Sequence, residues 1–467
     1  MNSLIVLLTA IALAGCAPMG PDYRRPELET PSQFKENSTW KFARPADQLS
    51  RGAWWKIFGD ATLNRLEDQA AANNPDLRAA MLRVEQARLV ARGSSAQLLP
   101  NASFTPAAER RLDSGNLRRS NIDAGDFGGL RNSFRLPLDA SYEVDFWGRV
   151  RRSIEAARAD ADAAAALGET ARLTLQADLA QNYFALRSVQ AEMDLLTATV
   201  ELRRKAVKLL RDRFEGGAIG ELDVARVDSE LGGVESDLAA LERRRAELVN
   251  AIAVLAGRPA SSFDLRVSPL AGSPPAVPSG VPADLLQRRP DIAEAERKMA
   301  AANARIGVAK AAFFPAIRLT GRVALESSST SDLFTSGSKA WAIGPSVNIP
   351  LFEQLVNCTV YAGRKLQFEE AVASYQSTVL RAFQEVENSL SGLRLLAAQA
   401  AAQERAVSAA ERAAVLSTDR YKAGAASNLE AVDADRTRLQ TLRISRQVAG
   451  QRFLTTIQLI KALGGGW

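Results

Sequence analysis

The sequence contains no histidine and only two cysteines among its 467 residues, Cys16 and Cys358. Without an imidazole base, a Ser-His-Asp triad is impossible, and histidine-based metal sites are excluded with it. If Cys16 is consumed by processing, no intramolecular disulfide remains, so a packed core has to stabilise the fold. The sequence also lacks a P-loop and a glycine-rich dinucleotide motif after a strand. We therefore predict neither an enzyme nor a metal or cofactor site.

Aromatic residues are scarce at 6%, whereas apolar residues make up 46% and charged residues 24% of the chain. This balance excludes a disordered chain and favours long helices over a β-rich globule. The net charge is +6, but the basic residues are interspersed with acidic ones, as in residues 201–205. Such mixing is typical of a solvated helix face, so we predict no nucleic-acid partner.

Residues 4–15 form an apolar run that ends in Leu-Ala-Gly immediately before Cys16. About a dozen residues are too few for a bilayer span, which needs about 20. They match the core of a signal peptide, although residues 1–3 carry no basic side chain. Leu-Ala-Gly-Cys resembles a bacterial lipobox, which implies that 1–15 is removed and that Cys16 carries S-diacylglycerol and N-palmitoyl groups. The alternative is an ordinary signal peptide followed by an incidental cysteine.

The chain contains an internal duplication. Asn-Pro-Asp-Leu at 74–77 recurs as Arg-Pro-Asp-Ile at 289–292, an offset of 290 − 75 = 215 residues. Arg-Phe at 213–214 recurs as Arg-Tyr at 420–421, an offset of 421 − 214 = 207 residues. Two separate stretches at nearly the same offset indicate two related halves.

Each half is predicted to consist of a helix, two strands and a long helical hairpin. The expected segments are a lipidated arm (16–59), a first repeat (60–257, with strands 100–111 and 131–147 and hairpin 148–257), a proline-rich linker (258–282) and a second repeat (283–467, with strands 316–327 and 340–352 and hairpin 355–463). Helix 149–214 would be about 100 Å long, so it needs a partner along its length. Its apolar residues follow three- and four-residue steps, as in a coiled coil, interrupted at Arg203.

The predicted strands alternate apolar and polar residues, most regularly between Phe134 and Phe146. A soluble sandwich gives the same alternation, but strands of about 9–13 residues also suit a tilted membrane span. Four strands cannot close a barrel, and open edges are not tolerated in lipid. Eight strands from two chains would fill their own interior, whereas twelve from three chains leave a lumen. We therefore expect a trimeric barrel, with extracellular loops at 112–129 and 327–338.

Several motifs in the mature chain occur together in one known family. They are Gly-Pro-Asp-Tyr at 20–23, Trp54-Trp55 with Phe58, Tyr-Glu-Val-Asp-Phe-Trp-Gly-Arg at 142–149, Arg-Pro-Asp-Ile at 289–292 and Leu-Gly-Gly-Gly-Trp at 463–467. In this order, they resemble the TolC family of outer-membrane efflux proteins, and specifically its OprM-like lipoprotein subgroup. The segment after Phe352 departs from the family pattern, because Glu-Gln-Leu replaces an acidic or Asn residue followed by two glycines.

The resemblance implies a mainly α-helical protein with a transmembrane β-barrel. Three chains would form a homotrimer whose twelve-stranded barrel, four strands per chain, continues into a long periplasmic α-helical barrel. Such a protein is the passive exit duct of a tripartite efflux pump for drugs or other small molecules. Its implied partners are a periplasmic adaptor, an inner-membrane resistance–nodulation–division pump and outer-membrane lipid. The alternative that we weigh is a trimeric coiled-coil surface protein.

The resemblance also implies a gate at the periplasmic tip. Position by position, Leu429 would form an apolar constriction and Asp433 an acidic ring, with Glu430 as a second acid and Arg436 on the same helix face. Tyr421 and Asp223 match positions that hold neighbouring hairpins together. Taken alone, these acids have a simpler explanation, because first helical turns favour acids and exposed ion pairs are common.

Overall fold

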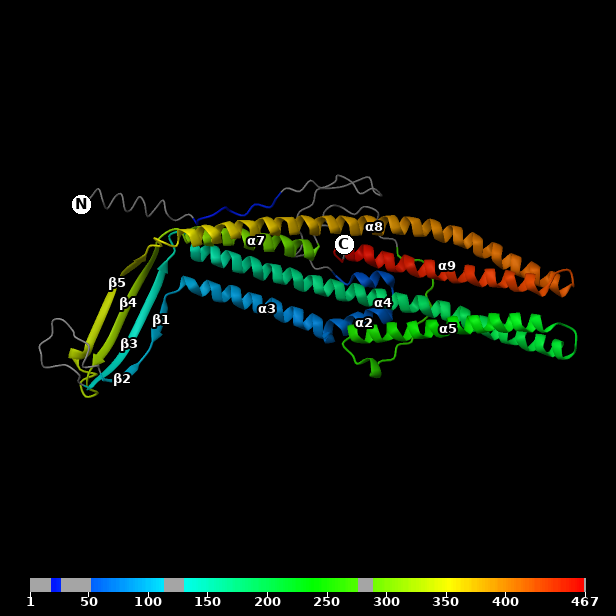
Figure 1. Ribbon diagram of the computed structural model, residues 1–467, viewed down its shortest axis with the longest axis horizontal. Helices are drawn as coiled ribbons and strands as arrows, with labels where there is room; N and C mark the ends of the chain where they lie inside the picture. Colours follow the sequence, from blue (N-terminus) through cyan, green and yellow to red (C-terminus); the bar gives the residue numbers. More distant parts are fainter. Residues whose placement is uncertain (1–17, 27–51, 113–129, 276–288, 466–467) are drawn as a thin grey trace. The chain divides into compact units, whose positions relative to one another are not determined.

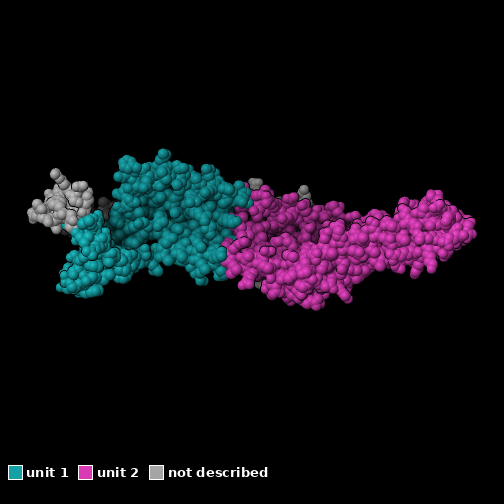
Figure 2. Space-filling view, turned by 60° about the horizontal axis from the view of Figure 1, so that its bottom comes forward, with its two compact units in different colours: residues 1–26, 85–163, 296–374 teal, residues 27–84, 164–295, 375–467 magenta. Residues whose placement is uncertain are grey.

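The computed structural model describes residues 18–26, 52–112, 130–275 and 289–465 (Figure 1). The predicted signal peptide, Cys16 and most of the first predicted loop lie outside these ranges. The chain divides into two compact units, one of residues 1–26, 85–163 and 296–374 and the other of residues 27–84, 164–295 and 375–467 (Figure 2). Each unit therefore takes segments from both sequence repeats.

The described elements follow the order expected for two repeats. Helices are η1 (Trp54–Phe58), α2 (Ala61–Asn73), α3 (Pro75–Ser95), η2 (Ala96–Leu98), α4 (Arg149–Glu215), α5 (Glu221–Leu255), η3 (Ala260–Ser262), α7 (Pro290–Ala311), η4 (Ser336–Ser338), α8 (Gln354–Lys422) and α9 (Asn428–Ala462). Strands are β1 (Asn101–Phe104), β2 (Ala107–Leu112), β3 (Leu130–Val144), β4 (Ala316–Ser327) and β5 (Lys339–Asn348). Helices α4 and α8 contain 67 and 69 residues. No described helix is both long enough and apolar enough for a bilayer crossing.

The first unit holds an antiparallel sheet in the order β1-β3-β4-β5, with β2 pairing the same side of β3 as β1. The single strand predicted over 100–111 is divided at Thr105-Pro106, because Pro106 has no N–H to donate. The sheet is nevertheless four strands wide, as expected. Strand β3 ends at Val144 rather than at residue 147, since the Asp145 carboxylate accepts hydrogen bonds from Val150 and Arg151 N–H, each at 3.0 Å, and begins α4.

The motif at 20–23 fixes the described part of the arm to the same unit. The Arg152 guanidinium, only 4% exposed, donates to the Asp22 carboxylate at 2.6 Å and to the Met19 carbonyl at 3.2 Å. Gly20 has φ +96° and lies so close to Gly307 that a Cβ on Gly20 would be 2.5 Å from the Gly307 Cα. Glycine is required on both sides of this contact.

The second unit has a core of packed aromatic rings. The Phe184 ring lies 4.8 Å from Phe58 and 5.0 Å from Phe453, measured between centroids. The Asp60 carboxylate caps α2, accepting from the Thr62 and Leu63 N–H groups at 2.9 and 3.0 Å. Phe58, the last residue of the aromatic motif at 54–58, is therefore part of this core.

The structure supports the duplication predicted from the sequence. Asn74 and Arg289, which precede the repeated prolines, make equivalent hydrogen bonds in the two repeats. The Asn74 amide donates to the Leu255 carbonyl at the end of α5 at 2.9 Å. The Arg289 guanidinium donates to the Ala462 carbonyl at the end of α9 at 3.0 Å. In each repeat, the same position therefore closes the far end of the returning helix, where carbonyls lack intrahelical partners.

Candidate functional site

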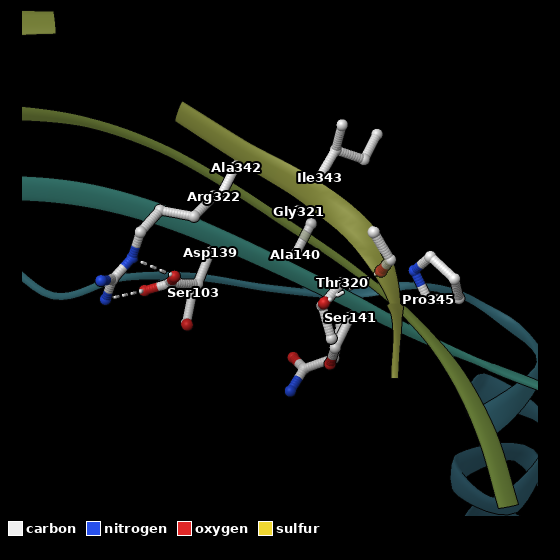
Figure 3. Close-up of a pocket in the computed structure, with 12 residues that line it drawn as sticks. Ser103, Asp139, Ala140, Ser141, Thr320, Gly321, Arg322, Ala342, Ile343 and Pro345 are labelled. Atoms are coloured by element: carbon white, nitrogen blue, oxygen red, sulfur yellow. Dashed lines mark hydrogen bonds and ion pairs between the residues drawn. The ribbon is translucent and has the colours of Figure 1, made fainter. Parts of the chain in front are cut away.

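One face of the sheet carries a series of ion pairs across β3 and β4. Asp139 and Arg322 are direct cross-strand neighbours and lie 2.8 Å apart (Figure 3). Glu143 and Arg318 are also opposite each other and lie 3.7 Å apart. The Asp139–Arg322 pair lines a hollow of about 520 Å³ together with small polar residues from neighbouring strands, among them Ser103, Ser141 and Thr320. This face suits contact with water and polar solutes.

The other face of the sheet is apolar and exposed in the single chain. The large side chains with at least half of their surface exposed include Trp341 (75%), Ile343 (80%), Val323 (63%), Phe104 (59%), Val347 (56%) and Leu138 (51%). In a soluble sandwich, the apolar face would be covered by a second sheet. Here both faces are accessible, so a wet face opposes a face suited to lipid or a partner chain.

The turns that join the hairpin helices have the same construction in both repeats. Gly217 (φ +70°) donates to the Phe214 carbonyl at 2.8 Å, and Gly424 (φ +73°) donates to the Tyr421 carbonyl at 2.9 Å. A glycine in the left-handed conformation therefore lies just after each of the two long helices, α4 and α8. The predicted gate residues lie immediately after the second of these turns.

The structure places the predicted gate residues on the first turns of α9. Leu429 is 51% exposed. The Glu430 N–H donates to the Ser427 hydroxyl at 3.3 Å, which caps the helix. Arg436 donates to the Asp433 carboxylate at 2.5 Å, and both side chains are more than half exposed. The two acids therefore lie one helical turn apart, with both side chains exposed.

The other two predicted residues are not joined within one chain. Asp223 lies in the first turn of α5, Tyr421 lies in the last turn of α8, and both are half-buried. No hydrogen bond links the Tyr421 hydroxyl to the Asp223 carboxylate among the described residues of this chain.

Sequence reasoning missed the partners of a buried charge within the helical hairpin. Arg203 is 8% exposed and donates to the Glu230 carbonyl at 2.7 Å and to the Glu230 carboxylate at 3.0 Å. Its other terminal nitrogen lies 3.6 Å from the Asp435 carboxylate on α9. The signal was present as the residue that interrupts the apolar seam of α4. A charge inside such a seam needs partners, and α5 and α9 supply them.

The profile of the family described as "Outer membrane efflux protein" matches residues 66–258 and 281–465. The chain is 31% identical over 471 residues to "Probable efflux pump outer membrane protein TtgC" of Pseudomonas putida, covering 99% of this chain and 95% of that protein. It is 30% identical over 472 residues to "Cation efflux system protein CusC" of an Escherichia coli O6:H1 strain, covering 99% and 98%. The solved open state of the Neisseria gonorrhoeae MtrE outer membrane channel superposes with a TM-score of 0.80 at 30% identity, covering 96% of this chain and 98% of that one.

The chain therefore belongs to the outer membrane efflux protein family. It is an outer-membrane protein that acts as an efflux duct and extends into the periplasm, and the predicted fold class is confirmed. Its relatives are channels rather than enzymes. The alternative of a coiled-coil surface protein is wrong, because the family match covers both repeats and the sheet combines strands from both.

Proposed function

We propose that three copies of the chain form one continuous duct through the outer membrane. The observation that carries this proposal is the five-stranded sheet, four strands wide, with an ion-paired face, an exposed apolar face and open edges at β1/β2 and β5. In lipid, the backbone N–H and C=O groups at the open edges of such a sheet can form hydrogen bonds only with the edge strands of further sheets. Threefold repetition gives twelve strands, with the apolar face toward lipid and the Asp139–Arg322 face toward the lumen.

The long hairpins α4–α5 and α8–α9 would enclose the periplasmic part of the same duct. Threefold symmetry would repeat Glu430 and Asp433 around one axis, producing a carboxylate ring that favours cations, and Leu429 would add an apolar ring that can exclude water. An adaptor protein would open this gate by binding the open arrangement more tightly than the closed one. The duct itself would be passive, with energy supplied by an inner-membrane resistance–nodulation–division pump.

The membrane anchor is a further part of the proposal. Acylation of Cys16 with diacylglycerol and palmitate would give several chains, and therefore a stable anchor. The described arm begins at Pro18 and is bound to the same unit as the sheet through Arg152, which supports an anchor close to the barrel. The placement in the OprM-like lipoprotein subgroup rests on this acylation.

The cargo class is small molecules rather than one dedicated substrate. Along β3 and β4, acidic and basic residues neutralise each other in pairs, so the face has no strong preference for one charge. The relatives include a protein named for cation efflux and another named for toluene efflux. We infer that selection of cargo lies mainly with the pump.

Planar-bilayer recording of the purified, detergent-solubilised protein tests the duct. We expect discrete conductance steps of uniform size, with a preference for cations that disappears in Asp433→Ala combined with Glu430→Ala. The exposed acid Glu201, which lies on α4 and pairs with the surface residue Arg204, provides the matched control Glu201→Ala. A folded protein that inserts into the bilayer but produces no conductance contradicts the proposal.

A further inference from the structure

The apolar face of the sheet carries only two charges on the described strands, and both are positive. This face consists of the even-numbered residues of β3 and the residues that pair with them on the other strands. Arg110 of β2 pairs with Asn132 of β3. Lys339 of β5 pairs with Leu325 of β4, which in turn pairs with Leu136 of β3. Two basic side chains therefore share a face that has no acid.

The ion-paired face treats its charges differently. It carries charges of both signs, and besides the two pairs across β3 and β4, Arg135 lies 3.4 Å from Glu109. The side chains of Arg110 and Lys339, by contrast, are exposed and form no ion pair or hydrogen bond with another described residue. A second copy of the sheet would not neutralise them, because the described strands bring no acid to this face. Their counter-charge has to come from outside the sheet.

Both cations lie toward the same end of the sheet. Arg110 is close to the C-terminal end of β2, and Lys339 is the first residue of β5. At this end β4 leads into β5, whereas at the opposite end the strands adjoin α4, α7 and α8 (Figure 1). In the proposed duct the helices extend into the periplasm, so the two cations lie at the extracellular end.

Each cation has an aromatic neighbour on the same face. Trp341, which is 75% exposed, is the next residue of β5 on this face after Lys339. Phe134 lies diagonally across from Arg110. Aromatic rings mark the boundary between hydrocarbon and headgroups, and long basic side chains can extend from that level into the headgroups. A charge facing lipid is costly in the middle of the bilayer and nearly neutral at this level.

The two ends of the apolar face are not equivalent. Near the helices the face has an aromatic residue, Tyr142, but no basic residue on any described strand. Basic side chains that served only to mark a membrane boundary would suit both ends equally. Their restriction to the extracellular end indicates a negatively charged partner that is present in one leaflet.

We propose that Arg110 and Lys339 form a binding surface for the phosphate groups of lipid headgroups in the outer leaflet of the outer membrane. The inference rests on the proposed duct, which turns the apolar face toward lipid. The guanidinium of Arg110 can bind a phosphate through two parallel hydrogen bonds, and the ammonium of Lys339 acts as a point charge. Three copies of the chain would repeat this surface around the barrel and hold phosphorylated lipid against its wall.

The first test measures lipid binding to the purified full-length protein in neutral detergent. Diphosphoryl lipid A is titrated, and native mass spectrometry gives the apparent dissociation constant. We expect this constant to rise about fivefold in Arg110→Gln or Lys339→Gln and about 25-fold in the double variant, as for basic side chains at an anionic surface. Arg111→Gln is the matched control, because it removes the same charge from the opposite face of the same strand. Its dissociation constant should equal that of the parent.

The second test separates charge from packing and lipid from free anions. Arg110→Lys combined with Lys339→Arg retains both charges and should bind lipid A far more tightly than the double glutamine variant. A phosphate-free galactolipid should bind the parent and the double glutamine variant equally. Inorganic phosphate at the concentration of the lipid should not displace lipid A; displacement would show a site for free anions and refute the lipid surface.

Conductance recorded from the same preparations distinguishes this inference from the duct. If the parent conducts and the double glutamine variant binds lipid A as tightly as the parent, the lipid surface is refuted while the duct stands. Equal weakening by Arg111→Gln refutes it as well, because the effect would then be one of net charge. A parent protein without conductance refutes the duct. If the double glutamine variant does not assemble, the single variants and the charge-retaining exchange decide.

Discussion

Glu67 gives the most quantitative prediction about stability. It lies on α2, is 2% exposed, and both of its carboxyl oxygens lack a hydrogen-bond partner in the described chain. Burial, with a further contribution from the neighbouring charge of Asp68, raises its pKa from 4.5 to about 9. The folded protein therefore holds this carboxyl protonated at neutral pH, whereas the unfolded chain releases the proton above pH 4.5.

The direction of the pH dependence follows from proton binding. Between pH 4.5 and about 9, the folded state binds one more proton than the unfolded state at Glu67, so stability decreases as pH rises. The expected slope is about 1.4 kcal/mol per pH unit, or about 3 kcal/mol between pH 5 and pH 7. The contribution is fully present below pH 4.5 and is lost as pH rises through the folded-state pKa.

Glu67→Gln removes this proton without changing the shape of the side chain. Thermal unfolding followed by circular dichroism in detergent should show parent and variant diverging with pH, the variant becoming relatively more stable by about 3 kcal/mol from pH 5 to pH 7. Glu201→Gln, at an exposed acid, should follow the parent throughout. If the difference between Glu67→Gln and the parent is constant over this range, the buried carboxyl is not protonated in the folded state and the reasoning is wrong.

Three further predictions concern the tip, the anchor and the arm. Asp223→Ala combined with Tyr421→Phe should raise the single-channel conductance in planar bilayers; an unchanged value would show that these residues do not hold hairpins together. Cys16→Ser should abolish acylation, and mass spectrometry that still detects lipid on the mature protein would exclude the lipobox. Gly307→Ala places a Cβ 2.5 Å from the carbonyl oxygen of the arm and should lower the free energy of unfolding by about 1–3 kcal/mol. The control Gly363→Ala, with open space around the glycine, should show no such loss in the same thermal melt.

The type and order of the long helices and strands could be predicted from the sequence, because the spacing of apolar residues indicates them. Alternation over residues 134–146 defined β3, and three- and four-residue steps defined the hairpin of α4 and α5. Just after α4, Gly217 has the left-handed conformation that is common at the end of a helix. In each case the local signal and the tertiary structure agree, which is the condition under which pattern analysis succeeds.

What the sequence did not reveal are contacts between segments far apart in the chain. Arg443 donates to the Glu192 carboxylate at 2.9 Å although the two are separated by 251 residues, and nothing in either local pattern indicates the other. The end of the strand predicted over 131–147 was also misplaced, because Asp145 caps α4 instead of continuing the strand. The partial clue was Arg203, whose charge inside an apolar seam required a distant partner. Gate residues could be assigned only through the family resemblance, since their local chemistry is that of ordinary exposed helix ends.

The central claim is that each chain supplies one third of the strands of a closed, trimeric barrel. The most direct test is the mass of the purified, lipidated protein in detergent, measured by native mass spectrometry alongside circular dichroism. A folded protein with three times the mass of one mature chain is the predicted result. A stable, helical monomer whose sheet remains intact in detergent would contradict the account.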